Sequence, residues 1–148
     1  MKIIAANNRA NYNFTISNKI EAGIVLTGSE VKSLRVNTGS IRGSYIIEQN
    51  GELWLTNSFI KKYQNSTENN YDPTRKRKLL VTKKELNKIS GSINQGGNTI
   101  VPLSLYFSEK GIAKLTCGIA KGKKKIDKRE SIKQRDWNIK KERLLKNN

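Results

Sequence analysis

The sequence predicts a mainly β fold: a small, closed, six-stranded antiparallel barrel of OB-like topology with two or three short helices and a basic C-terminal tail. Three observations lead to this prediction. Apolar and polar residues alternate over 12–17, which is the period-two pattern of a half-buried strand. Asn50-Gly51 separates the apolar segments 44–48 and 52–55, and both residues tolerate the positive φ of a tight hairpin. Turn residues divide the chain up to Ala120 into about six strand-length segments, although periodicity alone does not separate a closed barrel from an open sheet.

A short helix is predicted after the second apolar segment, 24–26. Ser29 is its predicted N-cap, because a serine hydroxyl can accept a hydrogen bond from the first turn. Lys32 and Arg35 are three residues apart, so the helix places these two cations side by side on one face.

The chain between the hairpin and the next helix is predicted to be a long exposed loop. Residues 59–60 extend the sheet, and residues 61–77 are then mostly polar. This loop ends in the basic run 75–78, where a mixture of arginine and lysine suits an RNA backbone.

A second helix is predicted over 82–90. Thr82 and Glu85 have the spacing of a capping box, and Gly91 is the expected end of the helix.

Two strands are predicted to complete the sheet, over 99–107 and 112–119. Pro102 lacks a backbone N–H, which indicates an edge strand or a bulge at this position. Cys117 lies in the last strand, and as the chain's one cysteine we expect it to be a buried, inert thiol.

The composition restricts the classes of function. The 148 residues carry a net charge of +17, which favours a nucleic acid as partner, and they contain no histidine. Without an imidazole, the usual general base and the usual zinc ligands are missing, so we expect no enzyme, no metal and no cofactor. We find no signal-peptide pattern and no apolar run that could span a bilayer, and therefore expect a cytoplasmic protein.

The tail, residues 121–148, holds twelve of the basic residues and four of the acidic ones, so it contributes +8 to the net charge. Its apolar residues recur at roughly helical intervals but are too few to form a core. We expect residues 1–120 to form the folded domain, and the tail to be disordered when free and helical when bound. The alternative is a solubilising extension without a specific function.

Aromatic residues and one carboxylate could also contact RNA, in addition to the basic runs. Tyr45, Trp54 and Phe59 lie in predicted strands, which favours packing in the core over stacking on bases. Trp137 lies in the tail, where we expect a contact made only in the bound state. Glu21 could accept hydrogen bonds from base amino groups or orient an arginine, and the composition does not choose between these roles.

Several motifs together resemble one family, small protein B, the partner of transfer-messenger RNA in the bacterial rescue of stalled ribosomes. The order and spacing of these motifs carry the resemblance over nearly the whole chain. They are Asn7-Asn8-Arg9-Ala10, IEAGI at 20–24, GSEVKSLR at 28–35, Asp72-Pro73-Thr74-Arg75, RKLL at 77–80, VPLSLYF at 101–107, KGKK at 121–124, and Asp127-Lys128-Arg129.

The resemblance implies roles for individual residues. The RNA-binding surface it implies consists of Asn7, Arg9, Glu21, Lys32, Arg35, Lys78 and Leu80, and the basic runs add Arg75, Arg77, Lys121, Lys123 and Lys124. In the tail, Asp127, Lys128 and Arg129 match a motif needed for tag synthesis, and Trp137, Leu144 and Leu145 match positions that engage ribosomal RNA along the empty messenger channel.

The resemblance also implies partners and shows two departures. A member of this family binds the tRNA-like portion of transfer-messenger RNA and the decoding centre of a stalled ribosome, meets elongation factor Tu and alanyl-tRNA synthetase only through the RNA, and acts as a monomer. Ile126 stands where many members have a histidine, and Gly43 stands where an aspartate is common.

Two other functions remain open from the sequence. One is a structural ribosomal protein built on a basic barrel. The other is an RNA-processing enzyme that uses Asp127 or Glu21.

Overall fold

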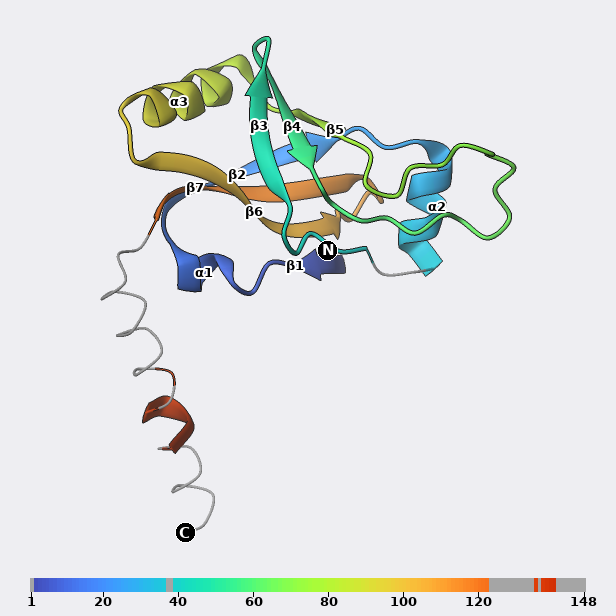
Figure 1. The fold of residues 1–148 in the computed structure, drawn as a ribbon, viewed down its shortest axis with the longest axis horizontal. Coiled ribbons are helices and arrows are strands. Elements are labelled where there is room, and N and C mark those ends of the chain that lie inside the picture. Colours follow the sequence, from blue (N-terminus) through green and yellow to red (C-terminus); the bar gives the residue numbers. More distant parts are fainter. Residues whose placement is uncertain (1, 37–38, 123–134, 136, 141–148) are drawn as a thin grey trace.

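The computed structural model of the protein describes residues 2–36, 39–122, 135 and 137–140 (Figure 1). Within these residues the chain forms one seven-stranded antiparallel sheet and three labelled helices. The strands are β1 (Lys2–Ala6), β2 (Phe14–Ile24), β3 (Tyr45–Gln49), β4 (Glu52–Thr56), β5 (Arg77–Leu80), β6 (Asn98–Phe107) and β7 (Ala113–Gly122), and the helices are α1 (Ala10–Asn13), α2 (Gly28–Val36) and α3 (Lys83–Asn94).

The mainly β prediction is confirmed, but the closed six-stranded barrel is wrong. The sheet has the order β1-β6-β7-β2-β5-β4-β3, and the described residues contain no ladder that joins its two outer strands. Strand β3 comes close to β6, but β6 already uses both of its edges for β1 and β7. The additional strand β1 therefore occupies the edge that closure would need, and the curled sheet stays open.

The predicted strands differ from the observed ones at several points. The strands β1 and β5 were not predicted, because β1 is short and β5 lies within a basic run. The segments 12–17 and 24–26 were predicted as two strands, but β2 covers Phe14–Ile24 as one, and Tyr12 belongs to α1. At 59–60 only an isolated bridge forms, between Ser40 and Phe59.

The hairpin between β3 and β4 is confirmed. Asn50 and Gly51 have φ values of 55° and 76°, and the last pair of the ladder is Gln49 with Glu52. Positive φ at both central residues is the requirement of a type I′ turn.

The two longer helices begin with capping boxes. In α3 the Thr82 hydroxyl accepts a hydrogen bond from the Glu85 N–H and the Glu85 side chain bonds back to Thr82, as predicted. The helix continues past Gly91, where its end was predicted, because Ile89 and Ile93 keep contact with the core.

Helix α2 begins at Gly28 and not at a Ser29 cap. The Thr27 hydroxyl accepts from the Glu30 N–H at 3.2 Å, and the Glu30 carboxylate accepts from the Thr27 N–H at 2.8 Å. This reciprocal pair is the capping box that the spacing of Thr27 and Glu30 could have revealed.

Strand β6 carries the predicted bulge. The register with β7 shifts between Pro102 and Ser104, which accommodates the missing N–H of the proline. The alternative of an edge strand is wrong, because β6 pairs on both sides.

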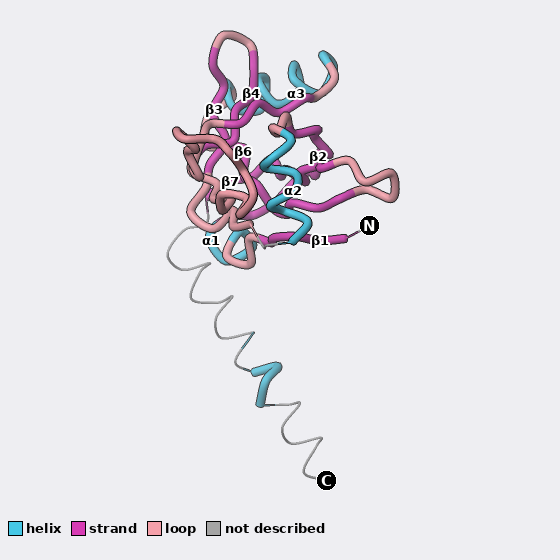
Figure 2. The backbone as a smooth tube through the Cα atoms, turned by 90° about the vertical axis from the view of Figure 1, so that its right-hand side faces the viewer, coloured by secondary structure: helices cyan, strands magenta, loops and turns pink. Residues whose placement is uncertain are grey.

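One hydrophobic core fills the concave side of the sheet. It includes Leu34 from α2, Ile89 from α3 and Leu115 from β7, all at most 3% exposed. Helices α3 and α2 lie on opposite sides of the molecule in Figure 1, and Figure 2 shows α2 in front of the strands. The outer face of β2 and β5 is exposed at Lys19, Glu21 and Leu80, and most of the predicted RNA-binding residues on the sheet lie on this face.

Candidate nucleic-acid interface

The structure describes most, but not all, of the residues predicted to bind RNA or the ribosome. Seven of them lie outside the described residues: Lys123, Lys124, Asp127, Lys128, Arg129, Leu144 and Leu145. The others come from β2, β5, β7, α2, the turn before α1, the loop before β5 (Arg75) and the described part of the tail (Trp137), and they form several separate groups rather than one.

The first group lies on the outer face of β2, β5 and β7. Gly23 of β2 is in register with Leu80 on one side and with Lys114 on the other. Glu21, two residues earlier on the same face of β2, has its Oε2 3.9 Å from Nζ of Lys114. Leu80 is 53% exposed although it is apolar. An exposed leucine beside a cation and a carboxylate is suited to contact a base and its sugar.

Lys114 is a member of this surface that sequence reasoning missed. The sequence contained a signal for it, because residues 113, 115 and 117 are apolar and alternate with Lys114. These three residues are buried in β7, so strand alternation puts Lys114 on the outer face. The structure also assigns Glu21 a neighbour, which is a lysine and not the arginine that we had considered.

Lys78 continues this face across β4. Its Nζ lies 2.9 Å from Oε1 of Glu52, and its Cα is in register with Trp54. The ammonium of Lys76 lies 4.7 Å from the centroid of the Trp54 ring and also bonds to Gln49. On this part of the sheet, Lys78 is thus paired with a carboxylate and Lys76 contacts an aromatic ring and an amide oxygen before any RNA binds.

The aromatic residues of this region are not packed as we expected. Tyr45 is 52% exposed and Phe59 is 45% exposed, so the prediction that both belong to the core is wrong. Trp54 is half-buried under Lys76. Tyr45 faces outward because its strand neighbour Ile46 takes the buried position.

Arg77 is completely buried, which excludes an RNA contact in this conformation. Its Nε and Nη2 lie 2.8 and 2.6 Å from Oε2 of Glu30, and its Nη1 donates to the hydroxyl and the carbonyl of Ser58. Its Nη2 also donates to the Pro73 carbonyl at 3.2 Å. All three guanidinium nitrogens therefore hold the long loop against α2, a structural role that the sequence did not reveal.

Arg75 is the outer partner of the same carboxylate. Its Nη2 lies 2.6 Å from Oε1 of Glu30, and its side chain is 39% exposed. Burial disfavours the charged form of Glu30, but hydrogen bonds from Arg75 and the Thr27 N–H, with the charge of Arg77, outweigh burial and lower the pKa of Glu30. Part of the Arg75 guanidinium can still meet solvent or RNA.

Lys32 and Arg35 are both exposed on α2, as their spacing predicted. The Arg35 guanidinium lies over the ring of Phe107 at 6.0 Å from its centroid. This contact directs Arg35 toward the end of β6, away from the Glu30 network at the start of the helix.

The turn between β1 and α1 holds Asn7 and Arg9. The Asn7 side-chain amide donates to the Pro102 carbonyl at 3.1 Å, so part of this residue has a structural role. Arg9 is exposed. Both line a hollow together with Arg42, which was not predicted as a site residue.

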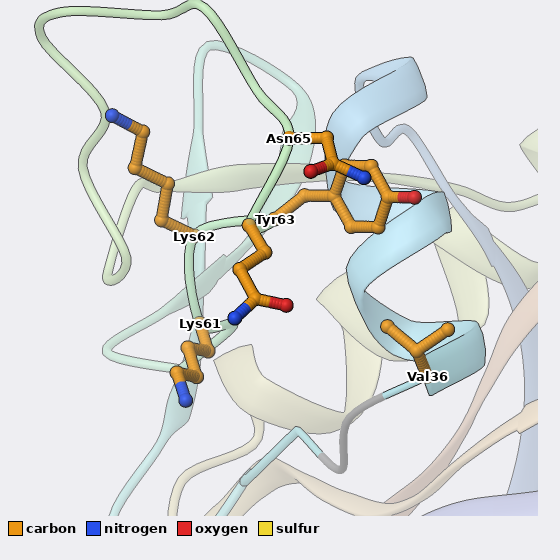
Figure 3. A pocket seen from close by; sticks show the side chains of 6 residues that line it. Val36, Lys61, Lys62, Tyr63 and Asn65 are labelled. Carbon is orange, nitrogen blue, oxygen red and sulfur yellow. The ribbon is translucent and has the colours of Figure 1, made fainter.

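Another hollow lies between α2 and the loop that follows β4 (Figure 3). It has a volume of about 370 Å³ and is lined by Val36, Lys61, Lys62, Tyr63, Gln64 and Asn65. Figure 3 shows the side chains of Lys61 and Lys62 pointing in different directions, so their ammonium groups do not converge on one point.

The end of β7 leads to the tail. Lys121 is exposed and is in register with Thr15 and Asn98. The strand ends at Gly122, two residues beyond the predicted end of the domain at Ala120. Arg135 and residues 137–140 are helical, and Trp137 is 59% exposed.

Two further observations concern chemistry. Cys117 is a free, buried cysteine, which confirms the predicted burial, and burial raises the pKa of its thiol to about 12. Among the described residues, no group of three or more histidine, cysteine, aspartate or glutamate side chains could hold a metal, and no helix is long and apolar enough to cross a membrane.

A curled antiparallel sheet with exposed cations and an exposed leucine on its outer face defines a basic, mainly β RNA-binding protein. The comparison with known families identifies which one. The SmpB protein family matches residues 4–147, and the chain belongs to this family.

Individual relatives agree with this assignment. The chain is 53% identical to the SsrA-binding protein of Ehrlichia canis over 148 residues, which cover all of both chains. It is 50% identical to the SsrA-binding protein of Brucella anthropi over 145 residues, 98% of this chain and 92% of that one. It is also similar to a solved structure described as "tmRNA-SmpB: a journey to the center of the bacterial ribosome", with 43% identity, a TM-score of 0.66, and coverage of 86% of this chain and 92% of the other.

Proposed function

We propose that this protein binds transfer-messenger RNA, also called SsrA, through its tRNA-like portion and delivers it to stalled ribosomes for trans-translation. The observation that carries the proposal is the family match over 4–147, with relatives named SsrA-binding protein at about 50% identity along the whole chain.

The described surface supports an RNA ligand. Lys114, Leu80 and Glu21 offer a cation, an apolar contact and a hydrogen-bond acceptor on one face of the sheet. Lys32 and Arg35 add two exposed cations on α2. Phosphates are bound by such cations, whereas base edges are read by acceptors and apolar groups.

In this proposal the folded domain and the tail bind different partners. Residues 1–120 form the domain that binds the RNA, with Lys121, Lys123 and Lys124 at the start of the tail as further contacts. Beyond these contacts, the tail, residues 121–148, enters the messenger channel of the small subunit, where a basic helix replaces the missing messenger RNA. Asp127, Lys128 and Arg129 act at the decoding centre, and Trp137, Leu144 and Leu145 act further along the channel.

Two further partners are proposed to contact the RNA and not the protein itself. Elongation factor Tu and alanyl-tRNA synthetase act on the charged RNA and meet this protein only through it. The protein itself is a cytoplasmic monomer and performs no catalysis.

The first experiment identifies the ligand. The tagged protein is recovered from cells, and its bound RNA is sequenced. Enrichment of transfer-messenger RNA over ribosomal RNA is expected. Stoichiometric recovery with salt-washed ribosomes in the absence of stalling would instead support a structural ribosomal protein.

The second experiment separates the two parts of the chain. Truncation before Asp127 is expected to leave the affinity for transfer-messenger RNA nearly unchanged and to abolish peptide tagging on stalled ribosomes. If the truncation reduced RNA binding as much as peptide tagging, the assignment of separate partners to the domain and the tail would be contradicted.

A further inference from the structure

A small hollow lies where the turn between β1 and α1 meets the turn before β3. It has a volume of about 210 Å³ and is lined by Ala6, Asn7, Asn8, Arg9 and Arg42. No acidic residue lines it, and within the described part of the chain neither arginine side chain forms an ion pair. Two arginines without an ion-pair partner in the described residues therefore line one cavity.

The first of the two turns is fixed against the sheet. The Asn7 N–H donates to the Leu103 carbonyl at 2.8 Å, and its side-chain amide donates to the Pro102 carbonyl. The Ala10 N–H then donates to the Asn7 carbonyl at 3.2 Å, and Ala10 is buried. The backbone that carries Arg9 is thus held at both ends.

The second turn is fixed as well. Arg42 is the second residue of a turn in which the Ser44 N–H donates to the Ile41 carbonyl at 3.1 Å. Ile41 is 1% exposed, and the side-chain amide of Asn57 donates to the Gly43 carbonyl at 3.3 Å. Since both backbones are already fixed, a ligand has to order only the two arginine side chains, which lowers the entropic cost of binding.

The chemistry of the hollow favours one kind of ligand. Guanidinium groups present paired N–H donors that match the oxygens of a phosphate. A volume of about 210 Å³ is below the roughly 300–1,000 Å³ of pockets that hold whole small molecules. It suits a single phosphate group of a longer chain.

Four of the other cations in the described part of the chain differ from this pair. Lys78 and Lys114 already lie beside the carboxylates of Glu52 and Glu21. The lysines of the hollow in Figure 3 point in different directions.

We propose that this hollow binds a phosphate of the RNA backbone, with Arg9 and Arg42 as its two guanidinium donors. The inference rests on the proposed function, because the RNA is the transfer-messenger RNA. It adds Arg42, which the resemblance did not assign, to the RNA-binding residues.

Affinity for a transcript of the tRNA-like portion, measured at several KCl concentrations, tests the role of Arg42. Arg42→Gln is expected to weaken binding about tenfold, as for the loss of a charge-assisted hydrogen bond. It should also reduce the slope of log affinity against log salt by nearly one. Arg42→Lys should restore the slope but only part of the affinity, because a lysine keeps the charge without the planar fork.

Lys110→Gln is the matched control. Lys110 is exposed in the turn between β6 and β7, near the end of β6 that pairs with Lys2 and far along the strand from Pro102. This variant loses the same charge and should bind within about twofold of the wild type. If Arg42→Gln also binds within twofold with an unchanged salt slope, the inference is overturned and the proposed function stands.

A scan with neutral methylphosphonate linkages locates the phosphate. One linkage should weaken binding of the wild type more than binding of Arg42→Gln, because that variant keeps only the Arg9 contact to this phosphate. If every linkage affects the two proteins equally, Arg42 binds no specific phosphate. Failure of the wild type to bind the transcript at all would overturn the proposed function itself.

Discussion

Replacement of Glu30 by glutamine isolates the buried charge network that holds the long loop against α2. The carboxylate of Glu30 is 1% exposed and lies within 2.8 Å of nitrogen atoms of both Arg75 and Arg77. Glutamine keeps the size of the side chain but removes the charge that balances Arg77, which is 0% exposed. The variant therefore leaves a cation buried without a counter-charge.

The expected loss of stability follows from the burial of Glu30 and Arg77. Removal of one partner from a buried pair typically costs about 3–5 kcal/mol, which is a large part of the roughly 5–15 kcal/mol that stabilises a domain. For a chain of this size we expect Tm to fall by about 10 °C or more. Arg75→Gln is the control, because Arg75 is 39% exposed and its loss leaves Arg77 paired with Glu30, so it should cost clearly less than Glu30→Gln.

Urea unfolding followed by circular dichroism measures both variants. A free energy of unfolding for Glu30→Gln within about 0.5 kcal/mol of the wild type would refute the argument, since surface substitutions commonly have effects of this size. Equal losses for Glu30→Gln and Arg75→Gln would also contradict it, because burial of Arg77 would then not be the cause.

The pH dependence gives an independent check. The pKa of Glu30 is lowered in the folded protein, so the unfolded state binds the proton more readily. The stability from this group is complete above the unfolded pKa, close to that of an ordinary glutamate, and is lost as the pH falls through the lower folded pKa. Glu30→Gln should show a weaker loss of stability over this acidic range than the wild type.

Three further predictions concern single side chains. Lys114→Gln should weaken binding to transfer-messenger RNA and lower its salt slope by nearly one, as measured by filter binding, and an unchanged slope would exclude a phosphate contact. Gly118→Ala should destabilise the fold by about 1–3 kcal/mol in urea unfolding, because the new Cβ would lie 3.0 Å from the Ile16 side chain and 3.1 Å from that of Leu103. Cys117, with its pKa raised to about 12, should react with a thiol reagent at pH 8 only after denaturant is added, and rapid labelling of the folded protein would show that the site opens.

Local signals in the sequence predicted the local structure well. The Asn50-Gly51 hairpin and the Thr82 capping box depend on a few neighbouring residues, and both are confirmed. The end of α3 was predicted wrongly because Gly91 costs only about 1 kcal/mol in a helix, less than the buried contacts of Ile89 and Ile93 contribute.

Long-range features could not be predicted in the same way. Closure of the sheet depends on which strand takes the free edge of β6, and the five residues of β1 give no sign of that pairing. The structural role of Arg77 depends on Glu30, which is 47 residues away in the sequence. The sequence of the basic run 75–78 alone therefore did not separate the buried Arg77 from the partly exposed cations beside it. The motifs of a known family supplied candidate RNA-binding residues that periodicity could not, but they did not point to Arg42, the proposed phosphate ligand.

The position of β7 has a mechanical consequence. This strand is paired along its length with β2 on one side and β6 on the other, and the chain continues from its last residue, Gly122, into the tail. A pull on the tail along the strand would load the hydrogen bonds of both ladders in shear at the same time, and would not peel them apart one by one. The tail is thus attached to a central strand that resists such a force through two ladders, which suits the proposed division between an RNA-binding domain and a ribosome-binding tail.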